Sequence, residues 1–351
     1  MTQRWKNKPA NSNWGDYGPD DQRGRMNEVT REKVLQGVAE VKEGRTFCLS
    51  LPLDYPGGNV LNPRRKPPRL APTLRDGARA GEQNFCWPFA ADNPDHTDVV
   101  CDDVVLLTLQ YSTQWDSFAH IGSRFDADGD GTRETVFYNG FRAGTDVLPG
   151  KENPGAEPWA KYEGARAASL GIQNLAEHGA QGRGVMIDLH AHVGRERKAI
   201  GYDALMRVLE ADKVVVERGD MVCLYTGFAD VIFELKKNPD PKLLSATCSG
   251  LDGRDGKLLQ WVSDSGLACL IADNYAVELI PTSLTQPAPH AAMPLHEHCL
   301  FKNGIHLGEM WYLTELAGWL RAAKRSRFLL TAPPLRLPGA VGSPATPIAT
   351  V

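Results

Sequence analysis

The fold is constrained most by the middle of the chain, where short apolar segments alternate with stretches of helical periodicity. Residues 185–189, 221–225 and 267–272 are mostly apolar and have the length of strands. Residues 202–210 and 258–265, which lie between them, carry apolar side chains at helical spacing. No internal repeat or domain linker interrupts the chain. The sequence therefore predicts a single α/β domain over residues 1–351.

The regions outside this alternation are less regular. Residues 1–45 are predicted to form an N-terminal extension, in which a helix runs from Asn27 to Val38 and buries a stripe of Val34, Leu35 and Val38. A strand is predicted at 46–53, and helices are predicted near 164–178 and 308–320. Residues 62–97 are rich in Pro, Arg, Gly and Asn without any period, and loops of that length are usually functional or disordered. The Pro- and Gly-rich tail 332–351 is predicted to wrap the surface.

Composition excludes several classes of protein. The net charge of -4 offers no broad basic face for nucleic acid or anionic lipid. The longest apolar runs are too short to span a membrane, and the N-terminus lacks the pattern of a secretory signal. The seven cysteines are scattered without a Cys-x-x-Cys pair, so we expect reduced, mostly buried thiols and a cytoplasmic location. The expected partner is a small-molecule substrate.

The densest group of potential ligands runs from Gln110 to His120. Residues 102–113 are predicted to form a buried strand that leads into it. On an extended strand Gln110, Gln114 and Asp116 share one face, and His120 follows at the strand's end. Amide and carboxylate oxygens suit hard or borderline divalent cations, and Zn²⁺ also accepts imidazole. A polar edge strand beside a capping histidine is the alternative interpretation.

A second group comprises His296, His298 and Glu309. Glu309 is predicted to open the helix 308–320, so that the turn before it can bring Glu309 and His296 together. Ordinary surface or helix-start residues are the alternative.

The first group resembles the hallmark motif of the cyclase family of metal-dependent hydrolases, which includes bacterial kynurenine formamidase and isatin hydrolase. Thr113, Asp116 and His120 match the motif, whereas Gln110 and Gln114 stand where the family has metal-binding histidines. The Gln pattern resembles a branch of the family that contains a trans-dienelactone hydrolase. The resemblance continues through residues 184–188, 218–227, 272–278, 295–310 and 338–344.

The resemblance implies a swivelling β/β/α fold, in which flanking helices cover a mixed sheet or barrel. It also implies a homodimer or homotetramer and a divalent metal, Zn²⁺ or Mn²⁺, held by Gln110, Gln114, Asp116, His296 and Glu309. The implied reaction is the metal-assisted hydrolysis of a lactone or similar cyclic ester or amide, with His120 or Glu309 as general base. An aryl formamidase or amidase, and a metal-poor binding protein that has lost turnover, remain the alternatives.

Three further features carry weaker predictions. Trp115 and Phe118 flank the motif and are expected to wall a substrate pocket, although a place in the core is the favoured alternative for Trp115. His190 and His192 share one face of a predicted strand, and the resemblance places His192 in the pocket lining. Asp126, Asp128 and Asp130 match half of a calcium loop, although an Asx-rich turn is the favoured interpretation. The chain has no nucleotide-binding glycine motif and no nucleophile elbow.

Overall fold

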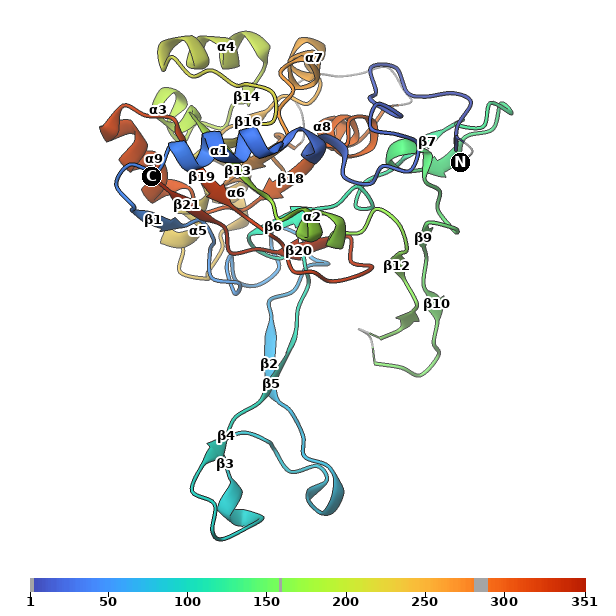
Figure 1. Cartoon of the computed structure of the whole chain (residues 1–351), viewed down its shortest axis with the longest axis vertical. Coiled ribbons are helices and arrows are strands. Elements are labelled where there is room, and N and C mark those ends of the chain that lie inside the picture. The colour runs from blue at the N-terminus through green and yellow to red at the C-terminus, as the bar shows by residue number, and fades with distance from the viewer. Residues whose placement is uncertain (1–2, 158–159, 281–289) are drawn as a thin grey trace.

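The predicted apolar segments form the centre of a nine-stranded mixed sheet in the computed structural model, which describes residues 3–157, 160–280 and 290–351 (Figure 1). The strands, in their order across the sheet, are β1 (Thr46–Cys48), β21 (Ile348–Thr350), β19 (Arg327–Thr331), β13 (Gln181–Asp188), β15 (Met221–Tyr225), β17 (Cys269–Ala272), β18 (His306–Glu309), β6 (Gln114–Asp116) and β20 (Gly342–Pro344). Strands β13, β15, β17 and β18 are parallel, and the outer pairs are antiparallel. The α/β class, with its mixed sheet, is confirmed.

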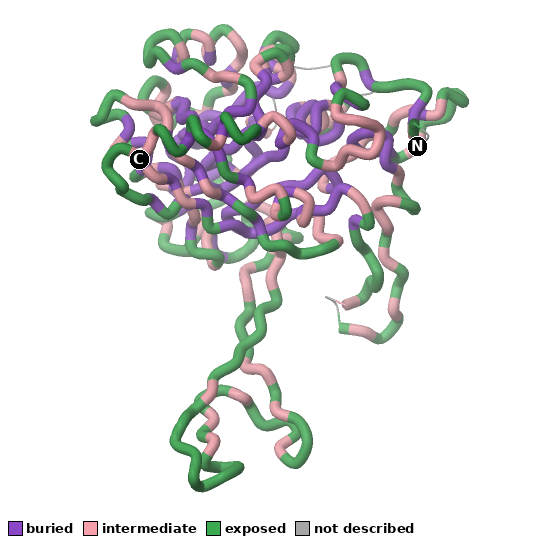
Figure 2. Tube along the Cα trace, in the orientation of Figure 1, coloured by how far each residue is buried: buried purple, intermediate pink, exposed green. Residues whose placement is uncertain are grey.

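Both faces of the sheet are buried because alternate side chains of the central strands enter different cores. Val185 and Ile187 of β13 pack in one core, whereas Met186 packs in the other. Helices that supply apolar side chains to the first core are α4 (Tyr202–Ala211) and α7 (Gly256–Asp264). Helices that supply the second core are α2 (Gln173–His178) and α9 (Thr314–Ala323). Figure 2 shows the buried chain gathered in this central body.

The N-terminal helix packs on the sheet by a face that differs from the predicted one. Helix α1 (Arg31–Ala39) is capped by Thr30 instead of Asn27, and Leu35 and Val38 are exposed. Gly37 faces β13 so closely that an added Cβ would lie 2.8 Å from the backbone of Gly182. Lys33 is buried beside it and forms an ion pair with Asp220. Close backbone approach, a buried ion pair and Val34, the one residue of the predicted stripe that packs against the second core, therefore dock this helix.

The C-terminal tail is part of the sheet, which corrects the expectation that it wraps the surface. Strand β21 lies between β1 and β19, and β20 pairs with β6 at the opposite edge. Ser343 and Ala349 are fully buried. The backbone groups of the tail are satisfied by ladder hydrogen bonds, which a surface loop would leave to water.

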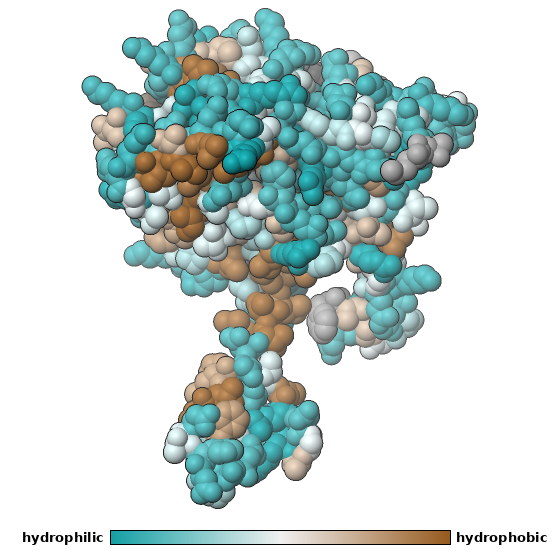
Figure 3. All heavy atoms as spheres, viewed as in Figure 1, coloured by the Kyte–Doolittle hydropathy of each residue, from teal (hydrophilic) through white to brown (hydrophobic). Residues whose placement is uncertain are grey.

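A long β-arm projects from the body, and we call residues 69–106 the arm (Figures 1 and 3). Its strands are β2 (Arg69–Pro72), β3 (Trp87–Pro88), β4 (Val99–Val100) and β5 (Asp103–Leu106), with 3-10 turns η2 (Gly77–Arg79) and η3 (Phe89–Ala91). The prediction of a buried strand over 102–113 is wrong, because Val104 and Val105 are about half exposed. No residue of this fully described range is buried. Apolar composition identified a strand here, but no core covers it.

The remaining elements are short and connect the sheet and its helices. The helical ones are η1 (Gly24–Glu28), η4 (Tyr138–Gly140), α3 (Leu189–Val193), α5 (Phe228–Glu234), α6 (Pro241–Ala246), α8 (Pro294–His296) and the π-helical η5 (Glu297–Lys302). The strands are β7 (Ser123–Phe125), β8 (Glu134–Val136), β9 (Val147–Leu148), β10 (Lys151–Glu152), β11 (Tyr162–Glu163), β12 (Arg166–Ala167), β14 (Ala199–Ile200) and β16 (Gly250–Leu251). Within the described ranges, none of the helices combines the length and the apolar character needed to cross a membrane.

Candidate metal centre

Two neighbouring antiparallel strands place the acidic ligands of the candidate site side by side. In the register of β6 and β18, Gln114 lies opposite Glu309 and Asp116 lies opposite Leu307. Glu309 therefore ends a strand, which corrects the prediction that it opens a helix. Gly308 permits the close packing here, because an added Cβ would lie 2.9 Å from Nε1 of Trp311. Gln114, Asp116 and Glu309 are all buried.

His296 reaches the same point from the short helix α8, and Glu278 holds it there. The backbone N–H groups of Leu295 and His296 both donate to the Glu278 carboxylate, at 3.2 and 3.0 Å. These are first-turn groups without an intrahelical acceptor, so Glu278 acts as a distant cap. Nδ1 of His296 also donates to Oε1 of Glu278 at 2.8 Å, and Nε2 donates to Oε1 of Glu309 at 3.0 Å. The imidazole is thereby fixed between two carboxylates.

One potential ligand atom from each of Asp116, His296 and Glu309 lies within 4.8 Å of the others. Nε2 of Gln114 donates to Oε2 of Glu309 at 3.0 Å. Oε1 of Gln114 and Oδ2 of Asp116 are buried and have no hydrogen-bond partner among the described residues. Buried acceptors without a donor are costly, and a cation between them removes that cost. The donor set therefore fits a divalent metal.

The electrostatics of the cluster also favour a cation. Burial by itself lowers the pKa of His296, but its hydrogen bonds to Glu278 and Glu309 outweigh this and raise the pKa to about 10. Burial and the charge of Asp116 raise the pKa of Glu309 above its usual range. Three buried carboxylates thus face one imidazolium and the guanidinium of Arg65, which lies 3.9 Å from Glu309, so the cluster keeps an excess of negative charge that a cation would offset.

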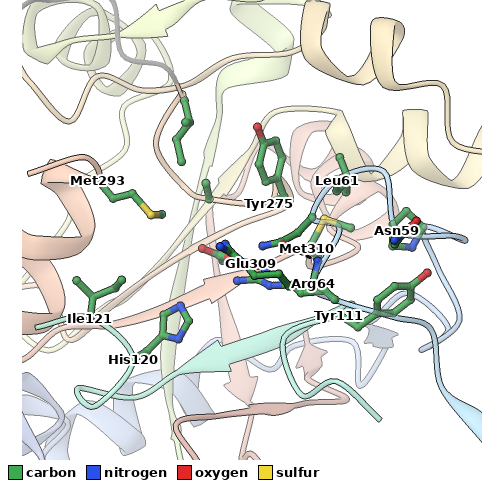
Figure 4. A pocket seen from close by; sticks show the side chains of 15 residues that line it. Asn59, Leu61, Arg64, Tyr111, His120, Ile121, Tyr275, Met293, Glu309 and Met310 are labelled. Atoms are coloured by element: carbon green, nitrogen blue, oxygen red, sulfur yellow. Dashed lines mark hydrogen bonds and ion pairs between the residues drawn. The ribbon is translucent and has the colours of Figure 1, made fainter. Parts of the chain in front are cut away.

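His120 lies at the edge of this cluster and not within it. Its Nε2 is 3.9 Å from Oδ2 of Asp116, and its ring lines a cavity of about 320 Å³ that Glu309 also lines. Burial lowers the pKa of His120, with further lowering by His296 and Arg65 that the charge of Asp116 opposes. The ring is therefore held neutral near pH 7 and faces the cavity (Figure 4).

Sequence reasoning missed most of the cavity wall. Arg64 and Arg65 line it, and Nη1 of Arg65 lies 3.9 Å from Oε2 of Glu309. Figure 4 shows Arg64 extending beside Glu309, with Tyr275 and Met293 around the same space. The two arginines belong to the aperiodic stretch 62–97, whose length was the one signal of a functional segment. No sequence pattern marks Glu278 as a site residue, because only its hydrogen bonds in the folded chain show that it lies beside His296.

Of the other predicted site residues, Gln110 lies next to the strand that carries Asp116, whereas Trp115, Phe118 and His192 lie elsewhere. Gln110 precedes β6 in a turn, but its side chain lies on the face of the sheet that carries Asp116, because Gly342 pairs with Asp116 and a Cβ added at Gly342 would lie 2.5 Å from Nε2 of Gln110. It makes no hydrogen bond to the cluster in the described part of the chain. Trp115 points to the opposite face of β6, where Nε1 donates to the Ala332 carbonyl, and Phe118 stacks on His306 in the core. The core interpretation of Trp115 therefore matches the structure, whereas the core position of Phe118 corrects the prediction that it walls the pocket.

His192 is not near the cluster. It lies on helix α3, not on a strand, because Asp188 caps a helix at that point through a hydrogen bond from the Ala191 N–H. The side chain of His192 is exposed, and its Nε2 lies 2.9 Å from Oδ2 of Asp212.

The acidic loop at residues 126–130 forms Asx turns. Asp126 accepts hydrogen bonds from the N–H groups of Gly129, Asp130 and Gly131, and Asp128 accepts from that of Asp130. Its carboxylates are thus engaged by the backbone, as the Asx-turn interpretation expects.

Comparisons with known proteins agree with this geometry. Residues 49–279 match the family described as "Putative cyclase". A crystal structure described as a novel cyclase is 29% identical, with a TM-score of 0.73, and the alignment covers 97% of this chain and 99% of that one. Isatin hydrolase A from Ralstonia solanacearum is 14% identical, with a TM-score of 0.53, over 91% of this chain and 97% of its own.

Isatin hydrolase A from Labrenzia aggregata, bound to benzyl benzoate, is 13% identical, with a TM-score of 0.52, over 91% of this chain and 97% of its own. At this identity the isatin hydrolases show a shared fold. No curated protein matches the chain in sequence. The family match spans well over half of the chain, and the arrangement of sheet and flanking helices is that of the similar structures. This chain is therefore a member of the cyclase family.

Proposed function

We propose that this protein is a metal-dependent hydrolase that opens a lactone or a similar cyclic ester or amide. The observation that carries the proposal is the pair of unpartnered buried oxygens, Oε1 of Gln114 and Oδ2 of Asp116, within a cluster that borders a cavity. Membership of the cyclase family and the fold shared with isatin hydrolases support a hydrolytic reaction.

The proposed metal is Zn²⁺ or Mn²⁺, held by Asp116, His296 and Glu309 with Gln114 as an additional oxygen ligand. Two carboxylates, an amide oxygen and one imidazole suit either ion. When bound, such an ion supplies Lewis acidity that polarises a scissile carbonyl and makes water a better nucleophile. Glu278 orients the imidazole of His296 through the hydrogen bond to Nδ1.

His120 is the proposed proton acceptor. Its ring faces the cavity, and burial keeps it neutral near pH 7, so that Nε2 is free to take a proton from the attacking water. Asp116 is the nearest carboxylate and stabilises the imidazolium that results. Glu309 is the second candidate, because it also borders the cavity.

The cavity wall indicates an anionic substrate with a ring. Leu61, Ile121 and Met293 provide apolar surface, whereas Arg64 and Arg65 bring two guanidinium groups to the same space. Arg64 makes no ion pair with any residue that the structure describes, so its charge is available to a ligand. Guanidinium groups bind carboxylates in bidentate geometry. We therefore propose a substrate that carries a carboxylate beside the scissile bond.

The resemblance of the Gln-containing motif to the branch with trans-dienelactone hydrolase supports a lactone over an amide. Of the two glutamines, Gln114 donates a hydrogen bond to Glu309 of the cluster, whereas Gln110 lies on the face of Asp116 without a hydrogen bond to the cluster in the described part of the chain. The proposal therefore rests on Gln114. A homo-oligomer and a cytoplasmic location stay predictions.

The test begins with the metal content of the purified protein and the effect of a chelator on the hydrolysis of a substrate panel. The panel contains carboxylated lactones, their methyl esters, cyclic amides and N-formyl aryl amines. We expect one or more divalent ions per chain, and lactone opening that a chelator abolishes and added Zn²⁺ or Mn²⁺ restores. Cleavage of only the N-formyl compounds would favour the formamidase alternative. Ligand binding without turnover in the metal-loaded protein would overturn the proposal in favour of a binding protein.

A further inference from the structure

The arm carries two cysteines that face each other outside the site described above. Sγ of Cys86 and Sγ of Cys101 are 3.7 Å apart, and both residues are exposed. In the adjacent ladder Trp87 pairs with Val100 and Pro88 pairs with Val99. The register therefore makes Cys86 and Cys101 the next cross-strand pair. Directly opposed residues of antiparallel strands have Cα atoms about 4.5 to 5.5 Å apart, a separation that a disulfide can bridge.

The two thiols are not equivalent. The backbone N–H of Cys86 donates to Sγ of Cys101 at 3.0 Å. The hydrogen bond and charge of Cys101 raise the pKa of the Cys86 thiol. Cys86 therefore keeps its proton more readily and stands next to Cys101 as a resolving thiol.

We propose that Cys86 and Cys101 form an oxidisable pair that a peroxide converts to an intramolecular disulfide. The Cys101 thiol is first oxidised to a sulfenic acid, while the peroxide O–O bond breaks and one water forms. The sulfur of Cys86 then attacks the sulfenic sulfur, so that the S–S bond forms and a second water leaves with the thiol proton. Overall, two thiols and one hydrogen peroxide give one disulfide and two waters.

The tip of the arm has no core and is held by surface contacts, such as the ion pair between Arg75 and Asp92 at 2.8 Å and the packing of Arg75 over the ring of Trp87. None of its residues is buried, and β3 and β4 contribute two residues each. Isolated two-stranded ladders are marginally stable in water. A covalent link between Cys86 and Cys101 would close the segment 86–101 and hold the two strands in register. The buried thiols of Cys223, Cys248, Cys269 and Cys299 lack this accessibility.

The sequence allows a direct test on the full-length protein. The protein is treated with hydrogen peroxide, alkylated without reduction and digested with trypsin, which leaves both cysteines in the single peptide 80–124. We expect this peptide to resist alkylation at both positions and to lose two hydrogen atoms. Cleavage at Asp92, Asp95 or Asp98 should then leave its two halves joined until a thiol reductant is added.

Variants and a protease assay complete the test. Cys86→Ser and Cys101→Ser should each abolish the link, whereas Cys48→Ser, which removes the other exposed thiol of the described chain, should leave it intact. Oxidation should also slow chymotryptic cleavage after Phe89 in the wild-type protein. Sulfinic acid at either cysteine, a disulfide between two copies of the chain, or alkylation of Cys86 and Cys101 at the rate of Cys48 would overturn the proposal.

Discussion

Oε1 of Glu278 accepts a hydrogen bond from Nδ1 of His296 at 2.8 Å, and the same carboxylate caps the helix that carries this histidine. One side chain therefore sets both the backbone position and the ring orientation of a proposed metal ligand. Carboxylates that orient metal-binding histidines in this way typically contribute about 10- to 100-fold to metal affinity.

Glu278→Gln should weaken metal binding by about 10- to 100-fold, since the amide cannot accept from Nδ1 and from the helix N–H groups as a carboxylate does. Isothermal titration calorimetry with Zn²⁺ measures the change. Glu234→Gln, which removes a surface carboxylate paired with Arg195, is the matched control and should leave the affinity unchanged. Equal affinity in both variants would mean that Glu278 supports the helix without influencing the metal.

Asp116→Ala should lose metal and activity together, because Asp116 supplies a buried carboxylate to the cluster. His120→Ala should retain most of the metal but lose about a hundredfold in kcat, the usual scale for a general acid–base group. Metal analysis beside steady-state kinetics separates these outcomes. If His120→Ala removes the metal as completely as Asp116→Ala does, His120 is a ligand and Glu309 becomes the base.

Gln114→His should tighten Zn²⁺ binding, because imidazole is a stronger donor to zinc than an amide oxygen. The side chain of Gln114 already contacts Glu309, so a ligand at this position lies beside the rest of the cluster. Calorimetry of the metal-free protein gives the affinity. Unchanged Zn²⁺ affinity in a correctly folded variant would show that residue 114 does not ligate the ion.

Arg64→Gln should raise KM for a carboxylated substrate by about tenfold, the scale of one charge-assisted hydrogen bond, and should leave kcat nearly unchanged. The methyl ester of the same substrate should show no such loss. Lys66→Gln is the control, because Lys66 is a nearby exposed cation that does not line the cavity. An equal rise in KM for acid and ester would indicate a packing role for Arg64.

The stability of the protein should fall as the pH is lowered from 7 towards 4, in part because of His298. Burial lowers the pKa of this histidine to about 4, and its Nε2 lies 2.9 Å from Oγ of Ser263. As the pH falls below 6.5, the unfolded chain binds a proton that folded His298 does not, so stability present near neutral pH is lost. The expected contribution is about 2 kcal/mol between pH 7 and pH 5.

Urea denaturation across this pH range checks the prediction. His298→Gln should flatten the dependence of the unfolding free energy on pH, whereas His96→Gln, on the exposed arm, should leave it unchanged. A slope that is the same in the wild-type protein and in His298→Gln would contradict the assignment.

The local pattern of apolar residues was enough to predict the central helices and strands of the fold. The apolar run Met221–Tyr225 forms the strand predicted from it, and the periodicity of Tyr202–Ala211 forms the predicted helix. Both predictions depend on side-chain spacing within a few residues, which the sequence displays directly. The residue types of Asp116, His296 and Glu309 likewise marked them as potential ligands before their positions were known.

The pairing of segments that lie far apart in the sequence decided which strands are buried and which site residues meet. Apolar composition predicts a strand near Val104, but only the fold shows that this strand projects into solvent, because burial depends on what packs against it. Glu309 ends a strand since β18 pairs with β6, and Gln110 reaches the face of Asp116 from a turn instead of from the same strand. The sequence alone thus determined which residues can do the chemistry, and the tertiary structure decided which of them meet, because their contacts join segments up to 195 residues apart.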